Sequence, residues 1–126
     1  MPVDDDRKVV EELYKAMQAG PAREAAIMAL FTDDAVLVEP FTGQPRTHSG
    51  KADIRAALAA IWQGRAPDLV LTLDRVDIEE DSVRAEWTCT SSILPGPLRG
   101  RDCLTVRSGK IAFLEITITE MPSFGR

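Results

Sequence analysis

The sequence predicts an α+β domain in which helices come first and a β-sheet follows. Apolar residues recur at helical spacing up to Trp62, and the helical runs end near Gly20 and Gly64. After Pro67 the pattern changes to an alternation of apolar and polar residues, which is typical of strands that bury one face. Helices followed by a run of strands is an element order of the α+β class.

Three helices are expected in the first half of the chain. The first has its apolar residues at positions 9, 10, 13, 14 and 17 and ends at Gly20. The second covers residues 22–31 and is shorter, and residues 32–34 (TDD) are expected to form a turn after it. The third covers residues 50–62, with Ser49 as its N-cap.

A short apolar strand is expected between the second and third helices. Residues 35–38 (AVLV) are apolar and partly β-branched, and Glu39 follows them directly. Pro40 ends the strand, because proline lacks the N–H that a sheet ladder needs and holds the preceding residue extended. Glu39 therefore lies at the mouth of a core strand, and residues 42–48 are expected to form a loop.

Four strands are expected after Pro67, over residues 68–78, 83–93, 98–107 and 110–119. Within the second of these, Val83, Ala85, Trp87 and Cys89 share one face. Ser108-Gly109 is expected to form a hairpin turn between the last two strands. Glu115 falls on the face opposite Leu114 and Ile116 and is expected to point outward.

Length and charge exclude several classes of protein. The chain has 126 residues, which is the size of one domain covering residues 1–126, and a net charge of −5. An acidic chain argues against a nucleic-acid partner and against an anionic membrane surface. Residues 1–8 (MPVDDDRK) do not have the pattern of a signal peptide, so a cytoplasmic location is expected.

The chain has few residues that favour a metal site. Cys89 and Cys103 are the two cysteines, and the chain has a single histidine, His48. The cysteines could form a disulfide or a reactive thiol, but two small buried residues are the favoured interpretation. No metal is expected, because there is no cluster of histidine, cysteine and carboxylate residues at the spacing of a zinc site. His48, in a polar segment before a helix, is read as a surface or capping residue rather than a base.

The chain resembles the nuclear transport factor 2-like superfamily in the order of its elements. This order is a helix, the segment FTDDA, an apolar strand, an acid followed by proline, a loop and the segment SGKADIR. That superfamily includes the SnoaL-like polyketide cyclases and the ketosteroid isomerases. The resemblance covers roughly residues 9–121 by element order. It implies three N-terminal helices packed in a strongly curved antiparallel sheet that forms a cone with an internal pocket.

The resemblance also implies roles for three residues. Glu39 stands where the isomerases carry the carboxylate that moves a proton on the substrate, although the family usually has aspartate there. Asp102 stands near the start of a late strand, where a protonated carboxyl donates to the developing oxyanion. By alternation it would share the apolar face of Leu104 and Val106 in that strand. A tyrosine on the first helix supplies a second donor. Tyr14 is the candidate, but alignment on Ala19-Gly20 places Leu13 there, one step and about 100° of helical rotation away.

Each candidate also has a structural interpretation. Asp102 could instead pair with Arg99 or Arg101, and Glu39 could be a solvated acid at a strand end. The candidate substrate-binding residues could equally fill the core. These residues are Trp62, Trp87, Leu104, Leu114 and Ile116.

Two functions remain open from the sequence. The first is a cofactor-free enzyme, similar to a steroid delta-isomerase or a polyketide cyclase, that acts on a small hydrophobic carbonyl compound. The second is a non-catalytic ligand-binding or assembly module of the same fold. In either case we expect a homodimer through the sheet face. An epoxide hydrolase of the same superfamily is disfavoured, because Trp87 and Cys89 stand where that branch carries polar residues.

Overall fold

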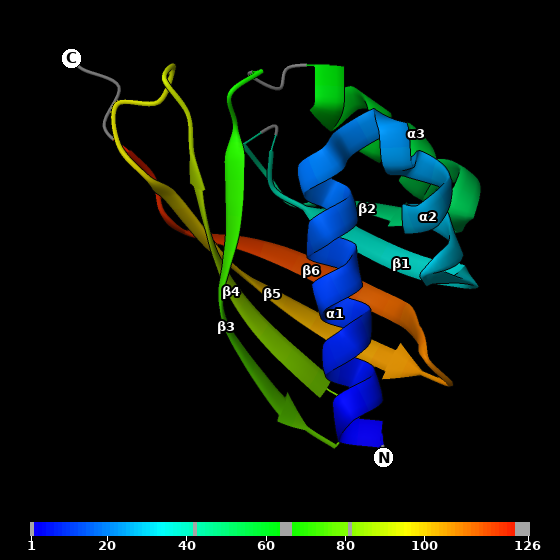
Figure 1. Ribbon diagram of the computed structural model, residues 1–126. Coiled ribbons are helices and arrows are strands. Elements are labelled where there is room, and N and C mark those ends of the chain that lie inside the picture. The colour runs from blue at the N-terminus through cyan, green and yellow to red at the C-terminus, as the bar shows by residue number, and fades with distance from the viewer. Residues whose placement is uncertain (1, 42, 64–66, 81, 123–126) are drawn as a thin grey trace.

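The computed structural model describes residues 2–41, 43–63, 67–80 and 82–122 (Figure 1). The helical elements are α1 (Pro2–Ala19), the 3₁₀ turn η1 (Gly20–Arg23), α2 (Glu24–Ala29) and α3 (Lys51–Gln63). The strands are β1 (Phe31–Glu39), β2 (Arg46–Ser49), β3 (Val70–Glu79), β4 (Ser82–Thr90), β5 (Leu98–Arg107) and β6 (Lys110–Glu120). The expected α+β class is confirmed.

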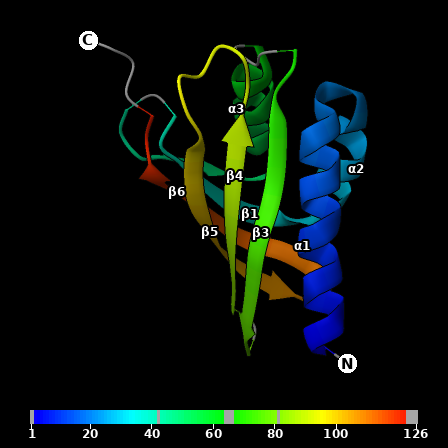
Figure 2. The same cartoon turned by 60° about the vertical axis from the view of Figure 1, so that its left-hand side comes forward.

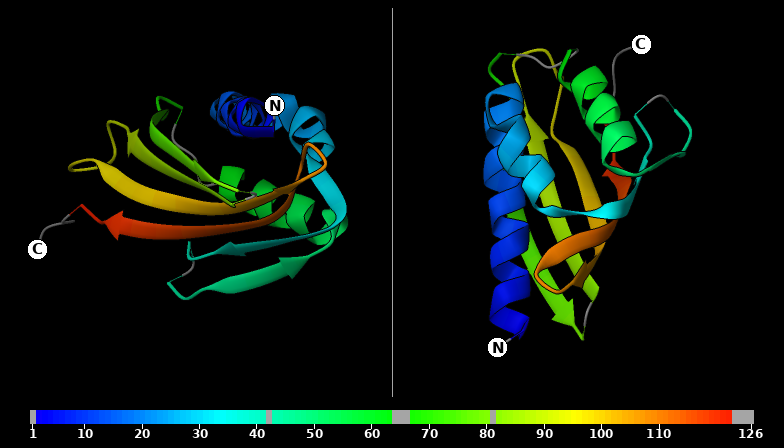
Figure 3. Two further views of the ribbon diagram at one scale, coloured as in Figure 1. Left: turned by 90° about the horizontal axis from the view of Figure 1, so that it is seen from below. Right: turned by 90° about the vertical axis from the view of Figure 1, so that its right-hand side faces the viewer.

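The six strands form one curved sheet in the order β2-β1-β6-β5-β4-β3. The helices lie against its concave side, and α1 runs along the part formed by β3 and β4 (Figures 1 and 3). An antiparallel sheet had been expected, but the sheet is mixed, because β1 and β6 run parallel. The chain between them contains α3 and four strands, which provides the long crossover that a parallel pair requires.

The second expected helix is the one that the structure corrects. Residues 22–31 do not form one helix, because Gly20–Arg23 is a 3₁₀ turn and α2 has only six residues. Gly20 has a φ of 78°, a left-handed conformation that ends α1 and redirects the chain. Two long helices, α1 and α3, therefore cover the sheet. Ser49 is not the N-cap of α3, because it belongs to β2 and Gly50 separates it from the helix.

Residues 32–34 and 42–48 also differ from the prediction. The expected TDD turn is part of β1, where the pairing with β6 shifts register between Phe31 and Val36. The expected loop contains the edge strand β2, which pairs antiparallel with β1. Three of the four residues of β2 are exposed, so it has no apolar alternation that a sequence reading could detect.

The four strands after Pro67 are confirmed within a few residues at each end. Val83, Ala85, Trp87 and Cys89 are buried, as their alternation predicts. Ser108 and Gly109 form the expected β5–β6 turn, with φ values of 55° and 78°. A two-residue hairpin loop favours positive φ at both positions, because the twist of that turn matches the twist of the strands.

The outer face of the sheet carries its exposed side chains, among them Glu115, Thr117 and Thr119 of β6. Figure 2 shows strands β3 and β4 in front of α3, with α1 beside β3. Cys89 is buried but Cys103 is exposed, which corrects the expectation that both are buried, and both are free thiols. The expected homodimer contact through this face stays a prediction. No helix in the described ranges is long and apolar enough to cross a membrane.

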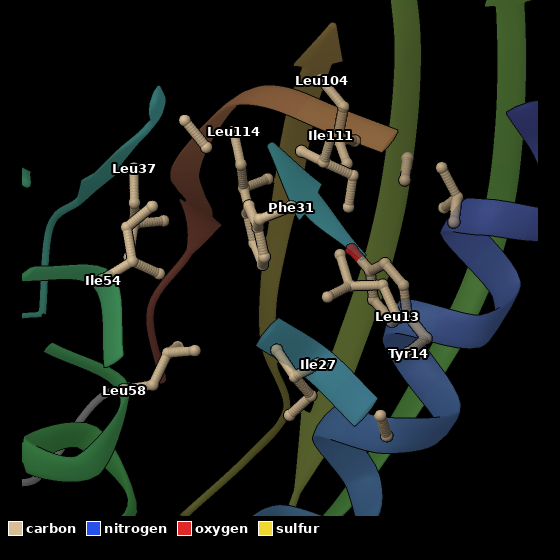
Figure 4. Close-up of a cluster of buried hydrophobic side chains, with 14 of the residues drawn as sticks. Leu13, Tyr14, Ile27, Phe31, Leu37, Ile54, Leu58, Leu104, Ile111 and Leu114 are labelled. Atoms are coloured by element: carbon tan, nitrogen blue, oxygen red, sulfur yellow. The ribbon is translucent and has the colours of Figure 1, made fainter. Parts of the chain in front are cut away.

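The core lies between the helices and the concave face of the sheet. Figure 4 shows Leu13 and Tyr14 of α1 projecting toward Phe31, Ile111 and Leu114. Further buried side chains come from α2 and α3, among them Ile27 and Ile54, which are fully buried. The helices are therefore held on the sheet by apolar packing, which is the dominant favourable term in folding.

Gln18 fixes the end of α1 to the edge strand β3. Its side-chain Nε2 donates to the carbonyl oxygen of Leu69 at 2.9 Å, and its Oε1 accepts from the amide of Leu71 at 2.5 Å. β3 is an edge strand, and the side-chain amide satisfies one backbone group in β3 and one in Leu69, the residue just before it, as a neighbouring strand would.

We predict that Gln18→Ala lowers the free energy of unfolding by about 1–3 kcal/mol, because it leaves the backbone groups of Leu69 and Leu71 without their partner. Urea denaturation followed by far-ultraviolet circular dichroism measures this change. Gln63→Ala is the matched control, since Gln63 is exposed at the end of α3. Its effect should stay within about 0.5 kcal/mol. Equal effects of the two substitutions would contradict the structural role of Gln18.

Candidate active site

An apolar cavity of about 260 Å³ lies between the helices and the sheet. Its lining comes from α1, α3, strands β1 and β3–β6, and adjoining loops. Asp102 is the one carboxyl group among the described residues that line it. A single acid surrounded by aliphatic and aromatic side chains suits a ligand that is apolar except for one polar group.

Asp102 reaches the cavity because of its place in β5. Asp102 shares the buried face of this strand with Leu104 and Val106, as the sequence predicted, and Gly100 lies on the same face. In the sheet, Asp102 lies between Ala85 of β4 and Ile116 of β6, both apolar. Only 6% of Asp102 is exposed, so its carboxyl group needs hydrogen-bond partners from the protein.

Two side chains from different elements supply these partners. The hydroxyl group of Tyr14 donates to Oδ2 of Asp102 at 2.5 Å. The indole Nε1 of Trp87 donates to Oδ1 at 2.9 Å. Each oxygen of the carboxyl group therefore has its own donor, one from α1 and one from β4. The structure thus brings together Tyr14, Trp87 and Asp102, which are far apart in the sequence.

The alternatives for the tyrosine and for Asp102 are both resolved by contacts. Leu13 and Tyr14 both line the cavity, and it is Tyr14 that contacts the carboxyl group. Arg99 lies 3.6 Å from Glu120, and Arg101 is exposed on the outer face of β5. The described partners of Asp102 are therefore a phenol and an indole rather than an arginine.

Burial shifts the acidity of both groups. Removal from water raises the pKa of Asp102 from 3.8 to about 6, although the hydrogen bonds from Tyr14 and Trp87 act in the opposite direction. Burial also raises the pKa of Tyr14 far above its ordinary value, and the nearby charge of Asp102 adds to this effect. Tyr14 therefore stays a neutral donor, while Asp102 can gain or lose a proton near neutral pH.

Glu39 is buried, but it is satisfied elsewhere. Its Oε2 lies 2.9 Å from Nε2 of His48 in β2, and its Oε1 accepts from the amide of Phe41 at 2.8 Å. Glu39 is not among the described residues that line the cavity. His48, which the sequence placed at the surface or in a cap, is instead its partner across the β1–β2 hairpin. The sequence analysis missed this pair because it expected residues 42–48, which include His48, to form a loop and not a strand paired with β1.

The remaining predicted residues divide between the cavity and the core. Trp62, Trp87, Leu114 and Ile116 line the cavity, whereas Leu104 belongs to the buried core. The sequence reading missed several lining side chains because their apolar character does not distinguish cavity from core. They include Met17, Leu37, Phe41, Leu58, Ile61 and Leu69.

The polar end of the cavity is its deep end. Phe41 lines the cavity and is 41% exposed, whereas Tyr14 and Asp102 are almost fully buried. Leu98 and Asp102 both line it from β5, and four strand residues span about 13 Å. A ligand that enters beside Phe41 would meet Asp102 with its leading end.

Within the described ranges, no three histidine, cysteine or carboxylate side chains gather as a metal site would require.

Solved structures with the same fold share little sequence with this chain. A candidate ketosteroid isomerase from Kribbella flavida has a TM-score of 0.75 at 18% identity, over 98% of this chain and 84% of that one. An NTF-2-like protein of unknown function from Burkholderia xenovorans has a TM-score of 0.77 at 17% identity, over 100% and 90%. A candidate polyketide cyclase from Sinorhizobium meliloti has a TM-score of 0.74 at 20% identity, over 87% and 94%.

The family itself is shown by the sequence. No protein of curated function matches the chain. The profile of the SnoaL-like domain, however, matches residues 10–114, which run from the middle of α1 to the first part of β6. This match covers Tyr14, Trp87 and Asp102. The chain therefore belongs to the SnoaL-like domain family, within the nuclear transport factor 2-like superfamily.

Proposed function

We propose that this protein is a cofactor-free enzyme that moves a proton on a small hydrophobic carbonyl compound, with Asp102 as the acid–base group. The observation that carries the proposal is the placement of Asp102. It is the one carboxyl group among the described residues of an apolar cavity, and its pKa of about 6 suits both uptake and release of a proton.

The reaction needs no external oxidant or reductant. The ionised Asp102 removes a proton from the carbon next to the carbonyl group, and the substrate becomes an enolate. The protonated Asp102 then returns this proton to another carbon, or the enolate carbon attacks a second carbonyl group of the same molecule and Asp102 returns the proton to the alkoxide that forms there. The first outcome is an isomerisation and the second is a cyclisation, and both begin with the same proton transfer.

Tyr14 can support the enolate once Asp102 is protonated. In the ionised state, the Tyr14 hydroxyl donates to Oδ2 of Asp102. When Asp102 has taken the substrate proton, this oxygen no longer carries the negative charge that attracted the donor. The Tyr14 hydroxyl can then turn toward the enolate oxygen, where the new charge lies.

This assignment differs from the roles that the resemblance implied. There Glu39 was the base and Asp102 a protonated donor. The contacts of Glu39 with His48 and with the amide of Phe41 give it a role in holding the segment at the cavity opening. The base role of Glu39 stays a prediction, and the cavity lining favours Asp102.

The catalytic prediction compares two variants, Asp102→Asn and Glu39→Gln. With a β,γ-unsaturated cyclic ketone or ketosteroid as substrate, Asp102→Asn should reduce kcat/KM by at least about 100-fold, because the acid–base group is lost. Glu39→Gln keeps a carbonyl oxygen for the amide of Phe41 and should reduce kcat/KM by less than about tenfold. The ultraviolet absorbance of the conjugated product measures turnover directly.

Ligand binding is the control for both variants. Trp62 and Trp87 line the cavity, so quenching of their fluorescence reports an occupied site. If Glu39→Gln loses as much activity as Asp102→Asn, the proposal that Asp102 alone is the acid–base group is wrong. Binding by the wild type without turnover of either ketone would instead favour a non-catalytic ligand-binding module. The absence of both binding and turnover would favour an assembly module.

A further prediction concerns the dependence of stability on pH. Because the pKa of Asp102 is raised in the folded state, that state holds its proton more tightly than the unfolded chain does. The contribution of Asp102 to stability is therefore present below pH 4 and is lost as the pH rises to about 6. The shift from 3.8 to about 6 corresponds to at most about 3 kcal/mol.

Urea denaturation of the wild type and of Asp102→Asn between pH 3.5 and pH 7.5 tests this sign. The other titrating groups cancel in the difference between the two proteins. The wild type should lose stability relative to Asp102→Asn as the pH rises through this window, and the variant should be the more stable protein at pH 7. A constant difference, or one that changes in the opposite direction, would show that Asp102 titrates normally.

A further inference from the structure

Trp87 and Gly100 face each other across strands β4 and β5. They are direct partners in the antiparallel register, and Gly100 lies two residues before Asp102 on β5. A Cβ atom added to Gly100 would lie 2.1 Å from Cζ2 and 2.4 Å from Cε2 of the indole. These distances are far below a van der Waals contact, so the indole occupies the space that any other residue at position 100 would fill.

This arrangement determines where the indole N–H points. Because Gly100 has no side chain, the indole can lie against the backbone of β5 and extend along it to Asp102. Its Nε1 then donates to Oδ1 of Asp102 at 2.9 Å, in a site where both residues are 6% exposed. The register shift of β5 against β6 between Arg99 and Gly100 lies at the same point of the strand.

We propose that Trp87 is a positioning residue for Asp102 and that Gly100 makes their contact sterically feasible. Trp87 holds Oδ1 of Asp102 as a hydrogen-bond acceptor in both protonation states. Oδ2 alone then gains and loses the proton. An indole N–H can only donate, so the oxygen that faces it cannot carry a hydrogen directed at the indole. The proton of neutral Asp102 therefore resides on Oδ2, the oxygen beside Tyr14.

The surroundings of Asp102 contain few other groups that could titrate. Tyr14 on α1 and Cys89 on β4 are the other titratable side chains in the described lining. The lining from α3, β1, β3 and β6 is uncharged. Asp74, an exposed residue of β3, adds to the raised pKa of Tyr14 but stays outside the cavity. Trp87 also lines a second, polar pocket that contains Asp74, Glu86, Arg99 and Arg101. A titration seen at Trp87 near pH 6 would therefore report Asp102 if it is absent from Asp102→Asn.

The inference rests on the proposed role of Asp102, but its test measures ionisation rather than turnover. It can therefore fail while the proposed function holds, or the reverse. The chain has two tryptophans, so ¹⁵N-labelled protein gives two indole N–H signals. We expect the signal of Trp87 to shift with pH at the pKa of Asp102 and to stay protected from exchange on both sides of this pKa. The signal of Trp62 should show no such transition.

Trp87→Phe keeps an aromatic ring but removes the donor. We expect it to raise the pKa of Asp102 by about one pH unit, measured from its ¹³C carboxyl signal, because a donor to a carboxylate stabilises the ionised form. Trp62→Phe is the matched control, since Trp62 lines the same cavity from α3. It should leave the pKa of Asp102 within about 0.3 units, because no donor to the carboxylate is lost.

Gly100→Ala tests the steric part of the proposal without removing the indole. Its Cβ should displace the indole and raise the pKa of Asp102 in the same direction as Trp87→Phe, in protein whose circular dichroism is unchanged. Equal shifts in Trp87→Phe and Trp62→Phe would overturn the proposal. So would loss of exchange protection at Trp87 below the pKa of Asp102, or an unchanged pKa in folded Gly100→Ala protein.

Discussion

The burial of one carboxyl group in an apolar cavity is the constraint on which the site depends. A carboxylate removed from water must be hydrogen-bonded, or the cost of its desolvation would be several kcal/mol. Asp102 meets this demand with Tyr14 from α1 and Trp87 from β4. The two donors do not cancel the effect of burial, since the pKa of Asp102 remains raised. The same balance that makes the group useful for proton transfer also makes it a weak point in stability.

The position of α1 follows from this constraint. Tyr14 reaches Asp102 only if the helix lies at one height and rotation against the sheet. Apolar packing of Leu13 and Val10 supplies most of the attraction, but such packing is not directional. Gln18 adds a directional contact with the backbone of β3, close to the cavity opening. The helix is therefore held at both the deep and the open ends of the cavity.

The two buried carboxyl groups of β1 and β5 show how similar residues take different roles. Glu39 and Asp102 are about equally buried, at 4% and 6% exposure. Glu39 has a histidine and a backbone amide as partners, in a hairpin at the edge of the sheet. Asp102 has two neutral side-chain donors and otherwise apolar neighbours. Local partners, rather than burial alone, therefore distinguish the surroundings of these two carboxyl groups.

The sequence by itself determined the α+β class, the four strands after Pro67 and the inward face of Asp102, because these follow from the spacing of apolar residues. It also indicated the family through the order of its elements, which the SnoaL-like profile confirms. Only the tertiary structure decided that β2 exists, that β1 and β6 are parallel, and that Glu39 pairs with His48. It alone decided that Trp87 and Tyr14 meet at Asp102. Local patterns cannot specify these features, because each depends on which distant segments lie side by side when the sheet curves around α1.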